Sequence, residues 1–164
     1  RWMNGEYLKA MDSETFYSAA KPYLKKALTK DFDLHRIAEM VRTRIEVYPD
    51  ITEMIAFFEQ LPDYDISLFT NKKAKTDAEK SLVTLKELLP LLEAAEDFTN
   101  DGLFEMLKTY AQEKGCKINS VMWPLRIAVS GQSVTPAGAT EIMDILGKNE
   151  SIARIHIAIN KLEA

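Results

Sequence analysis

The sequence has a single cysteine, Cys116, among 164 residues, so no disulfide can form within the chain and a reducing cytoplasm is the expected compartment. No apolar run approaches the roughly 18 residues that a membrane-spanning helix needs, and no signal peptide is recognisable. Only two histidines are present, His35 and His156, and neither has another histidine or a cysteine at ligand spacing. Glycine-rich phosphate loops and converging acid–base sets are also missing. We therefore expect no membrane, no metal centre, no catalytic residue and no cofactor in this chain.

Acidic side chains outnumber basic ones, and the net charge of −4 argues against a protein whose whole surface attracts nucleic acid. The charges are unevenly distributed along the chain. Residues 46–65 carry six acids and no lysine or arginine, and residues 87–105 carry six more acids and no base. Residues 114–140 contain no acid, and the first 30 residues carry six bases against three acids. A local cationic patch for RNA is compatible with this pattern, although chance segregation of charge explains it equally simply.

Apolar residues recur at helical spacing almost throughout, and no stretch alternates with the period of two that a strand requires. We therefore expect an all-α fold made of two small helical bundles. Residues 63–73 show no clear period and are the predicted linker, so residues 1–62 form the first subdomain and residues 74–164 the second. Pro22 should break or kink the helix in which it lies.

Capping residues predict where the helices begin and end. The expected starts are Asp50–Glu53 and Thr76–Glu79 as capping boxes, Thr99 or Asn100, Asn119 or Ser120, Thr135 with Pro136, and Asn149. The expected stops are Gly115, Gly131 and Gly147.

Two arginine positions are candidates for binding. Arg126 is the only charge between Lys117 and Glu141, in an apolar helix, where a guanidinium needs an anion or a planar partner. The partner is either RNA or a carboxylate of an acidic helix. Nearby Trp123 can stack on a base, but its apolar neighbours favour burial in the core.

Arg42 and Arg44 form the second position. Residues two apart differ by about 200° around a helix, so both cannot reach one ligand unless the helix has already ended. Nothing in the pattern alone chooses between them.

Three motifs, taken in order, resemble the anticodon-binding region of bacterial-type glutamyl-tRNA synthetases. They are Arg1–Leu8, Val41–Arg44, and Met122–Gly131 followed by Thr135–Gly138, Glu141-Ile142 and Leu146–Lys148. The resemblance covers essentially the whole chain. It implies a parent enzyme, a class I glutamate–tRNA ligase, that activates glutamate with ATP and Mg²⁺ and esterifies tRNA(Glu). Because the chain opens at Arg1 and lacks both ATP-binding signatures of that class, we expect an inactive fragment that follows upstream catalytic and stem-contact domains.

The resemblance also implies which residues meet the RNA. It places the reader of the last anticodon base at Arg44, and contacts to the first and middle bases at Arg126 and at a helix start formed by Thr135 and Pro136. Secondary candidates are Arg42, Trp123 and Lys117. The implied partner is the anticodon loop of tRNA(Glu), not DNA. The family often has Pro-Gly and then a bulky apolar residue, whereas this chain reads Pro136-Ala137-Gly138-Ala139-Thr140, so a base-stacking role for that residue does not carry over.

Two other hypotheses compete with RNA binding. A helical protein-interaction or scaffold module would show a contiguous exposed apolar face. A free-standing synthetase paralogue that has lost aminoacylation would share the same motifs. RNA binding instead requires Arg44, Arg126 and the Thr135 region to line one electropositive surface.

Overall fold

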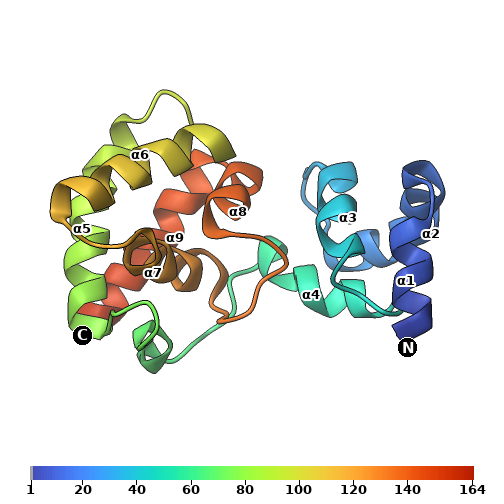
Figure 1. Cartoon of the computed structure of the whole chain (residues 1–164), viewed down its shortest axis with the longest axis horizontal. Helices are drawn as coiled ribbons and strands as arrows, with labels where there is room; N and C mark the ends of the chain where they lie inside the picture. Colours follow the sequence, from blue (N-terminus) through green and yellow to red (C-terminus); the bar gives the residue numbers. More distant parts are fainter. Residues whose placement is uncertain (1) are drawn as a thin grey trace. The chain divides into compact units, whose positions relative to one another are not determined.

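The computed structural model describes the backbone of residues 2–164 and the side chains from Gly5 onward, so the side chains of Arg1–Asn4, in the first motif, lie outside the described part. Its elements are helical (Figure 1). They are α1 (Trp2–Ala10), α2 (Ser13–Ala27), α3 (Leu34–Arg42), α4 (Asp50–Glu59), the 3₁₀ helix η1 (Ile66–Phe69), α5 (Ala78–Ala94), α6 (Asn100–Lys114), α7 (Ile118–Ser130), α8 (Ala139–Leu146) and α9 (Lys148–Glu163). The predicted all-α class is confirmed. None of the described helices is long and apolar enough to cross a bilayer.

The chain divides into two compact units, residues 1–60 and residues 61–164. The expected linker, residues 63–73, lies within the second unit. Tyr64 and Phe69 are buried there with their ring centroids 5.9 Å apart, and the Trp123 indole N–H donates to the carbonyl of Leu68 at 2.9 Å. This segment shows no helical period because it packs through separate aromatic side chains and a 3₁₀ turn.

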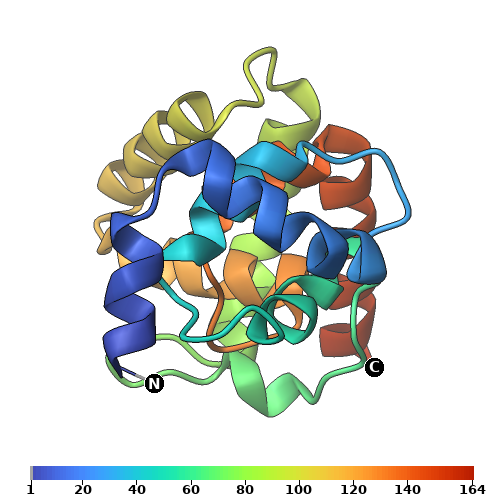
Figure 2. The same ribbon diagram turned by 90° about the vertical axis from the view of Figure 1, so that its right-hand side faces the viewer.

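The first unit is built around α2, which packs against α3 and α4 (Figure 2). Its core consists of fully buried apolar side chains from these three helices, including Phe16, Leu24, Ile37, Val41, Ile51 and Ile55. Pro22 lies inside α2, which is continuous, so no second helix begins there.

The second unit is built around α7, which contacts α5, α6, α8, α9 and η1 and is seen nearly end-on in Figure 1. Five of its apolar side chains are almost completely buried: Val121, Leu125, Ile127, Ala128 and Val129. A helix that is apolar on nearly every side is stable only when other elements surround it in this way.

Several predicted helix ends are confirmed. Thr99 caps α6 by accepting from the amide of Gly102. The predicted box at Thr76–Glu79 is one residue off, because Asp77 rather than Thr76 caps α5 and the Thr76 hydroxyl pairs with that of Ser81. The glycine stops at positions 115, 131 and 147 follow α6, α7 and α8, all with positive φ.

Other predicted starts are wrong. Pro49, not Asp50, precedes α4, because the Asp50 carboxylate turns back to accept from the amides of Glu46 and Val47. Helix α7 follows Lys117 rather than Asn119 or Ser120, since the Ser120 hydroxyl donates to the carbonyl of Ala74 at 2.6 Å. Helix α9 follows Gly147 rather than Asn149.

We predict unequal costs for alanine at two left-handed glycines. Gly115 has φ +70° and open space around its Cα, so Gly115→Ala should cost only the conformational strain, about 1–2 kcal/mol. Gly131 has φ +67°, and an added Cβ would lie 3.0 Å from Pro62 and Tyr64. Gly131→Ala should therefore cost roughly 1–3 kcal/mol more. Urea unfolding followed by circular dichroism measures both, and equal losses would contradict the packing described here.

Candidate nucleic-acid interface

Arg126 lies half-buried on α7, and two contacts orient its guanidinium. One terminal nitrogen donates to the carbonyl of Ser133 at 3.4 Å, and the guanidinium carbon lies 5.8 Å from the centroid of the Trp123 ring. The spacing of three residues places both side chains on one face of the helix. The arginine is therefore held at the surface beside an aromatic ring.

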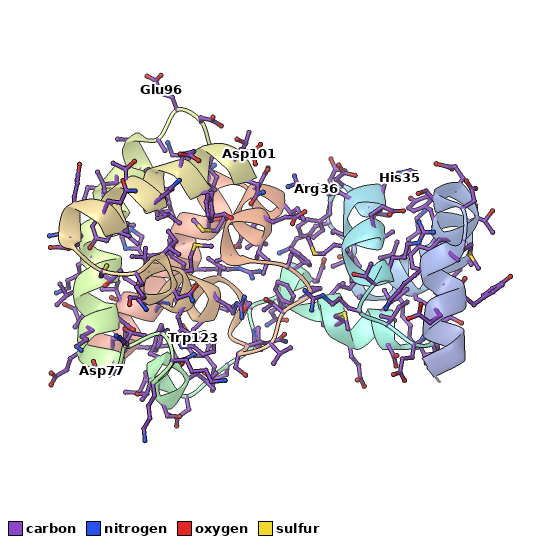
Figure 3. The ribbon with its side chains drawn as sticks, viewed as in Figure 1. His35, Arg36, Asp77, Glu96, Asp101 and Trp123 are labelled. Carbon is purple, nitrogen blue, oxygen red and sulfur yellow. The ribbon has the colours of Figure 1, made fainter. Side chains whose placement is uncertain are left out.

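Trp123 is only partly buried, between the core position and the exposed position that its sequence context suggests. Its indole N–H is fixed to the carbonyl of Leu68 in η1, and its ring is half-buried. Figure 3 shows Trp123 at one end of the second unit and the exposed acids Glu96 and Asp101 at the other. Glu96 and Asp101 of the acidic run are thus separated from Trp123.

A cavity of about 200 Å³ opens beside these two side chains, and we call it the Arg126 pocket. It is lined by Asn71, Lys73, Ala74, Asn119, Met122, Trp123, Arg126 and Ala139. Two cations, two amides and an indole ring are the groups that hydrogen-bond and stack on unpaired RNA bases.

The helix start at this pocket differs from the predicted one. Thr135 and Pro136 are both buried and precede α8 by three residues, and the Thr135 hydroxyl donates to the carbonyl of Ala137 at 2.6 Å. Helix α8 instead begins at Ala139 after Gly138, and no side chain caps it. Since Ala139 lines the Arg126 pocket, the amide donors of α8 begin at this pocket.

Arg42 is a structural residue of the first unit. It is 9% exposed, and its guanidinium donates to the carbonyls of Leu8 and Lys9 at 3.0 and 3.1 Å, where α1 ends. It also donates to the Ser13 hydroxyl and pairs with the Glu39 carboxylate at 3.2 Å. These contacts join α1, α2 and α3, so Arg42 is occupied within the fold.

Arg44 is exposed, one residue past Thr43, which ends α3. Because Arg44 lies beyond the helix, its direction is not fixed by the angular separation of about 200° between residues two apart on a helix. Arg44 lines a small cavity of about 160 Å³ together with Gly5, Glu6, Lys9, Thr43, Ile45 and Glu46. Of the two arginines, Arg44 is the one available to a ligand.

Lys117 is exposed at the start of α7 but does not line the Arg126 pocket; it lines a separate cavity described below. Sequence reasoning missed Asn71 and Lys73 as lining residues. The sequence signal for them is a local turn, because the side-chain oxygen Oδ1 of Asn71 accepts from the amides of Lys73 and Ala74, as an asparagine at a turn commonly does. Among the described residues, no group of three or more His, Cys, Asp or Glu side chains could hold a metal ion.

Comparison with known proteins agrees with the fold. A family profile described as "Anticodon binding domain" matches residues 15–159. The chain is 52% identical to the glutamate–tRNA ligase of Lachnoclostridium phytofermentans, over 100% of this chain and 34% of that protein. It is 48% identical to the glutamate–tRNA ligase of Clostridium acetobutylicum, over 99% of this chain and 34% of the relative.

A solved structure is also similar. The crystal structure of a glutamate tRNA ligase from Elizabethkingia meningosepticum in complex with its amino acid matches with a TM-score of 0.84 at 28% identity, over 98% of this chain and 32% of that chain. The chain therefore belongs to the anticodon binding domain family. It spans about a third of the length of the curated glutamate–tRNA ligases that it matches, and the resemblance stated from its motifs is confirmed.

We predict unequal stability effects for substitutions of the two neighbouring arginines. Arg42→Gln should lower the free energy of unfolding by roughly 2–4 kcal/mol, because buried carbonyls of α1 lose their donor. The control Arg44→Gln should change it by no more than about 0.5 kcal/mol, as exposed substitutions usually do. Chemical denaturation measures both, and similar losses would show that Arg44 also supports the fold.

Proposed function

We propose that this chain is the tRNA anticodon-binding part of a glutamate–tRNA ligase and that its partner is the anticodon loop of tRNA(Glu). The whole enzyme would join glutamate to tRNA(Glu) with ATP and Mg²⁺ in the cytoplasm. Its catalytic and stem-contact domains would lie in the two thirds of the relatives' length that this chain does not match, so this chain alone is inactive in aminoacylation. Both subdomains would bind the anticodon loop: residues 1–62, which include the end of the stem-contact segment, and residues 74–164.

The observation that carries the proposal is the Arg126 pocket. A guanidinium keeps its charge and offers only donors, so in a half-buried position it favours a ligand with acceptor atoms and a planar face. An unpaired base provides both, because its edge accepts hydrogen bonds and its ring stacks on an indole or a guanidinium. Lys73 and Asn119 add donors around the same cavity.

The resemblance places a contact to the RNA at Thr135 and Pro136. We instead assign the hydrogen-bond donors for that contact to the residues that follow them. The Thr135 hydroxyl is used inside its own loop. The amides at the start of α8, from Ala139 onward, take over the role of meeting a phosphate or a base acceptor. Thr135 and Pro136 then contribute by fixing the path of this loop.

The rival protein-interaction hypothesis has weaker support. The large exposed apolar side chains of the second unit come from several elements: Ile66 in η1, Val83 and Leu91 in α5, Phe104 in α6, Val134 in the loop before α8, and Ile157 in α9. Scattered exposed apolar residues are common on soluble proteins. A cavity lined by cations and an indole ring favours RNA instead.

We predict that Arg126→Ala weakens binding of the tRNA(Glu) anticodon stem-loop to this chain by roughly 1–3 kcal/mol, the range for a lost stacking contact. The melting temperature should change little, because the guanidinium lies at the surface and its hydrogen bond to the carbonyl of Ser133 is exposed. Fluorescence anisotropy gives the affinity and circular dichroism the melting temperature. Lys108→Ala, an exposed charge on α6 outside the pocket, is the matched control. A large drop in melting temperature with unchanged affinity would make Arg126 a structural residue.

Arg44 should make the parent enzyme prefer an anticodon that ends in C over one that ends in G. The pairing edge of C presents two acceptors to the guanidinium, whereas that of G presents donors and leaves the arginine unpaired. Since glutamate and glutamine tRNAs differ at this base, the enzyme should charge tRNA(Glu) and refuse tRNA(Gln).

Arg44→Gln in the full-length enzyme should relax this choice, because an amide carries both a donor and an acceptor. The ratio of kcat/KM for the two tRNAs measures the effect. Lys25→Gln, another exposed cation of the same unit, is the control. If the ratio is the same in wild type and Arg44→Gln, Arg44 is not the reader.

A further inference from the structure

A second cavity of the same unit, about 620 Å³ in volume, lies between α5, α6 and the turns that precede α5 and α7, and we call it the lysine groove. Four exposed lysines from four segments line it: Lys75, Lys80, Lys114 and Lys117. One carboxylate, that of Glu87, also lines it, and it accepts from Lys114 at 3.0 Å and from the hydroxyl of Tyr110. The lining therefore carries an excess of positive charge.

Lys75 has an unusual backbone conformation. Its φ of +56° is the one positive value of a non-glycine residue in the part of the chain that the structure describes. Glycine or asparagine would adopt this conformation at lower cost. Strained backbone positions cluster at functional sites, so Lys75 is a candidate for binding a ligand in this groove.

The turn that holds Lys75 is rigid. The backbones of Asn71 and Thr76 exchange two hydrogen bonds, at 2.9 and 3.2 Å. The carbonyl of Ala74, which is buried, accepts from the Ser120 hydroxyl at 2.6 Å. Lys75 is thus presented to the groove from a fixed backbone.

The same turn separates the lysine groove from the Arg126 pocket. Lys73 lines the pocket, and Lys75, two residues later, lines the groove. The α7 residues that face this turn divide in the same way: Asn119 lines the pocket, and Ser120, which bonds to Ala74, lines the groove. A strand with one base in the pocket therefore has a cationic path beside it that continues over the turn.

We propose that the lysine groove binds the sugar–phosphate backbone of the RNA strand that enters the Arg126 pocket, next to the base held there. This inference rests on the proposed function. Lysines recognise phosphates as point charges without reading sequence, so the groove adds affinity and register while Arg126 and its neighbours contact a base. The exposed Val83 gives the groove an apolar surface beside these charges.

The test compares salt dependence across four forms of this chain: wild type, Arg126→Ala, the double variant Lys75→Gln/Lys117→Gln, and a charge-matched control, Lys25→Gln/Lys108→Gln. The ligand is the anticodon stem-loop of tRNA(Glu). Each lost phosphate contact on single-stranded RNA should reduce the slope of log K against log salt by about 0.7, so the groove variant should lose about 1.4. The control variant should keep the wild-type slope.

Cys116 supplies a local readout, because it is exposed, lines the groove and is the only cysteine of the 164 residues. RNA should slow its reaction with a neutral maleimide several-fold in wild type and much less in the groove variant. A polyglutamate peptide should not protect it. Equal protection by that peptide would overturn an RNA-specific role for the groove.

The outcomes separate the two proposals. If Arg126→Ala weakens binding while the groove variant behaves like its control, the groove proposal fails and the proposed function stands. If wild type prefers the anticodon loop no more than a scrambled loop, the proposed function fails, and the groove proposal fails with it.

Discussion

The burial of α7 is the constraint on which the second unit depends. Each fully buried aliphatic side chain of this helix contributes about 1.5–3 kcal/mol of transfer free energy, and five neighbouring elements are needed to cover them. The last turn of the helix is tied down as well. Arg154 of α9, 2% exposed, donates to the carbonyl of Val129 at 2.7 Å, where the helix dipole is negative. Burial lowers the pKa of this guanidinium, and Glu150 partly offsets that shift.

A helix fixed so completely holds its one charged side chain in a defined position. Arg126 is the half-buried charge of α7, and the indole of Trp123 beside it is anchored to η1. The pocket next to them draws its other walls from the turn before α5 and from the start of α8. That start is itself fixed, since the Thr140 hydroxyl donates to the side chain of Asn100 at 2.7 Å. Because the core holds the pocket residues in fixed positions, the pocket is pre-organised, and this lowers the entropic cost of binding a ligand.

Much of this architecture could be predicted from the sequence. Apolar spacing indicated the helices, and the glycines at positions 115, 131 and 147 marked their ends because the backbone there is left-handed. The resemblance singled out Arg126 and the 41–44 segment. The helical pattern by itself could not separate Arg42 from Arg44, because their difference depends on the two α1 carbonyls that Arg42 reaches across the fold.

The errors at Ser120 and Thr135 share one physical cause. Short polar side chains near helix starts have several partners within reach, and tertiary contacts decide among them. Ser120 bonds to Ala74 rather than capping α7, and Thr135 closes a turn instead of opening α8. The role of Lys73 and Lys75 as lining residues follows from the fold of a turn that has no periodic signal.

The central claim is that the second unit holds an RNA loop at the Arg126 pocket. Amide hydrogen exchange of this chain, measured with and without the tRNA(Glu) anticodon stem-loop, tests it most directly. The account predicts slower exchange in residues 71–76, in residues 118–126 and at the start of α8, with residues 87–105 unchanged. Slower exchange confined to residues 87–105, or no change anywhere in the second unit, would contradict it.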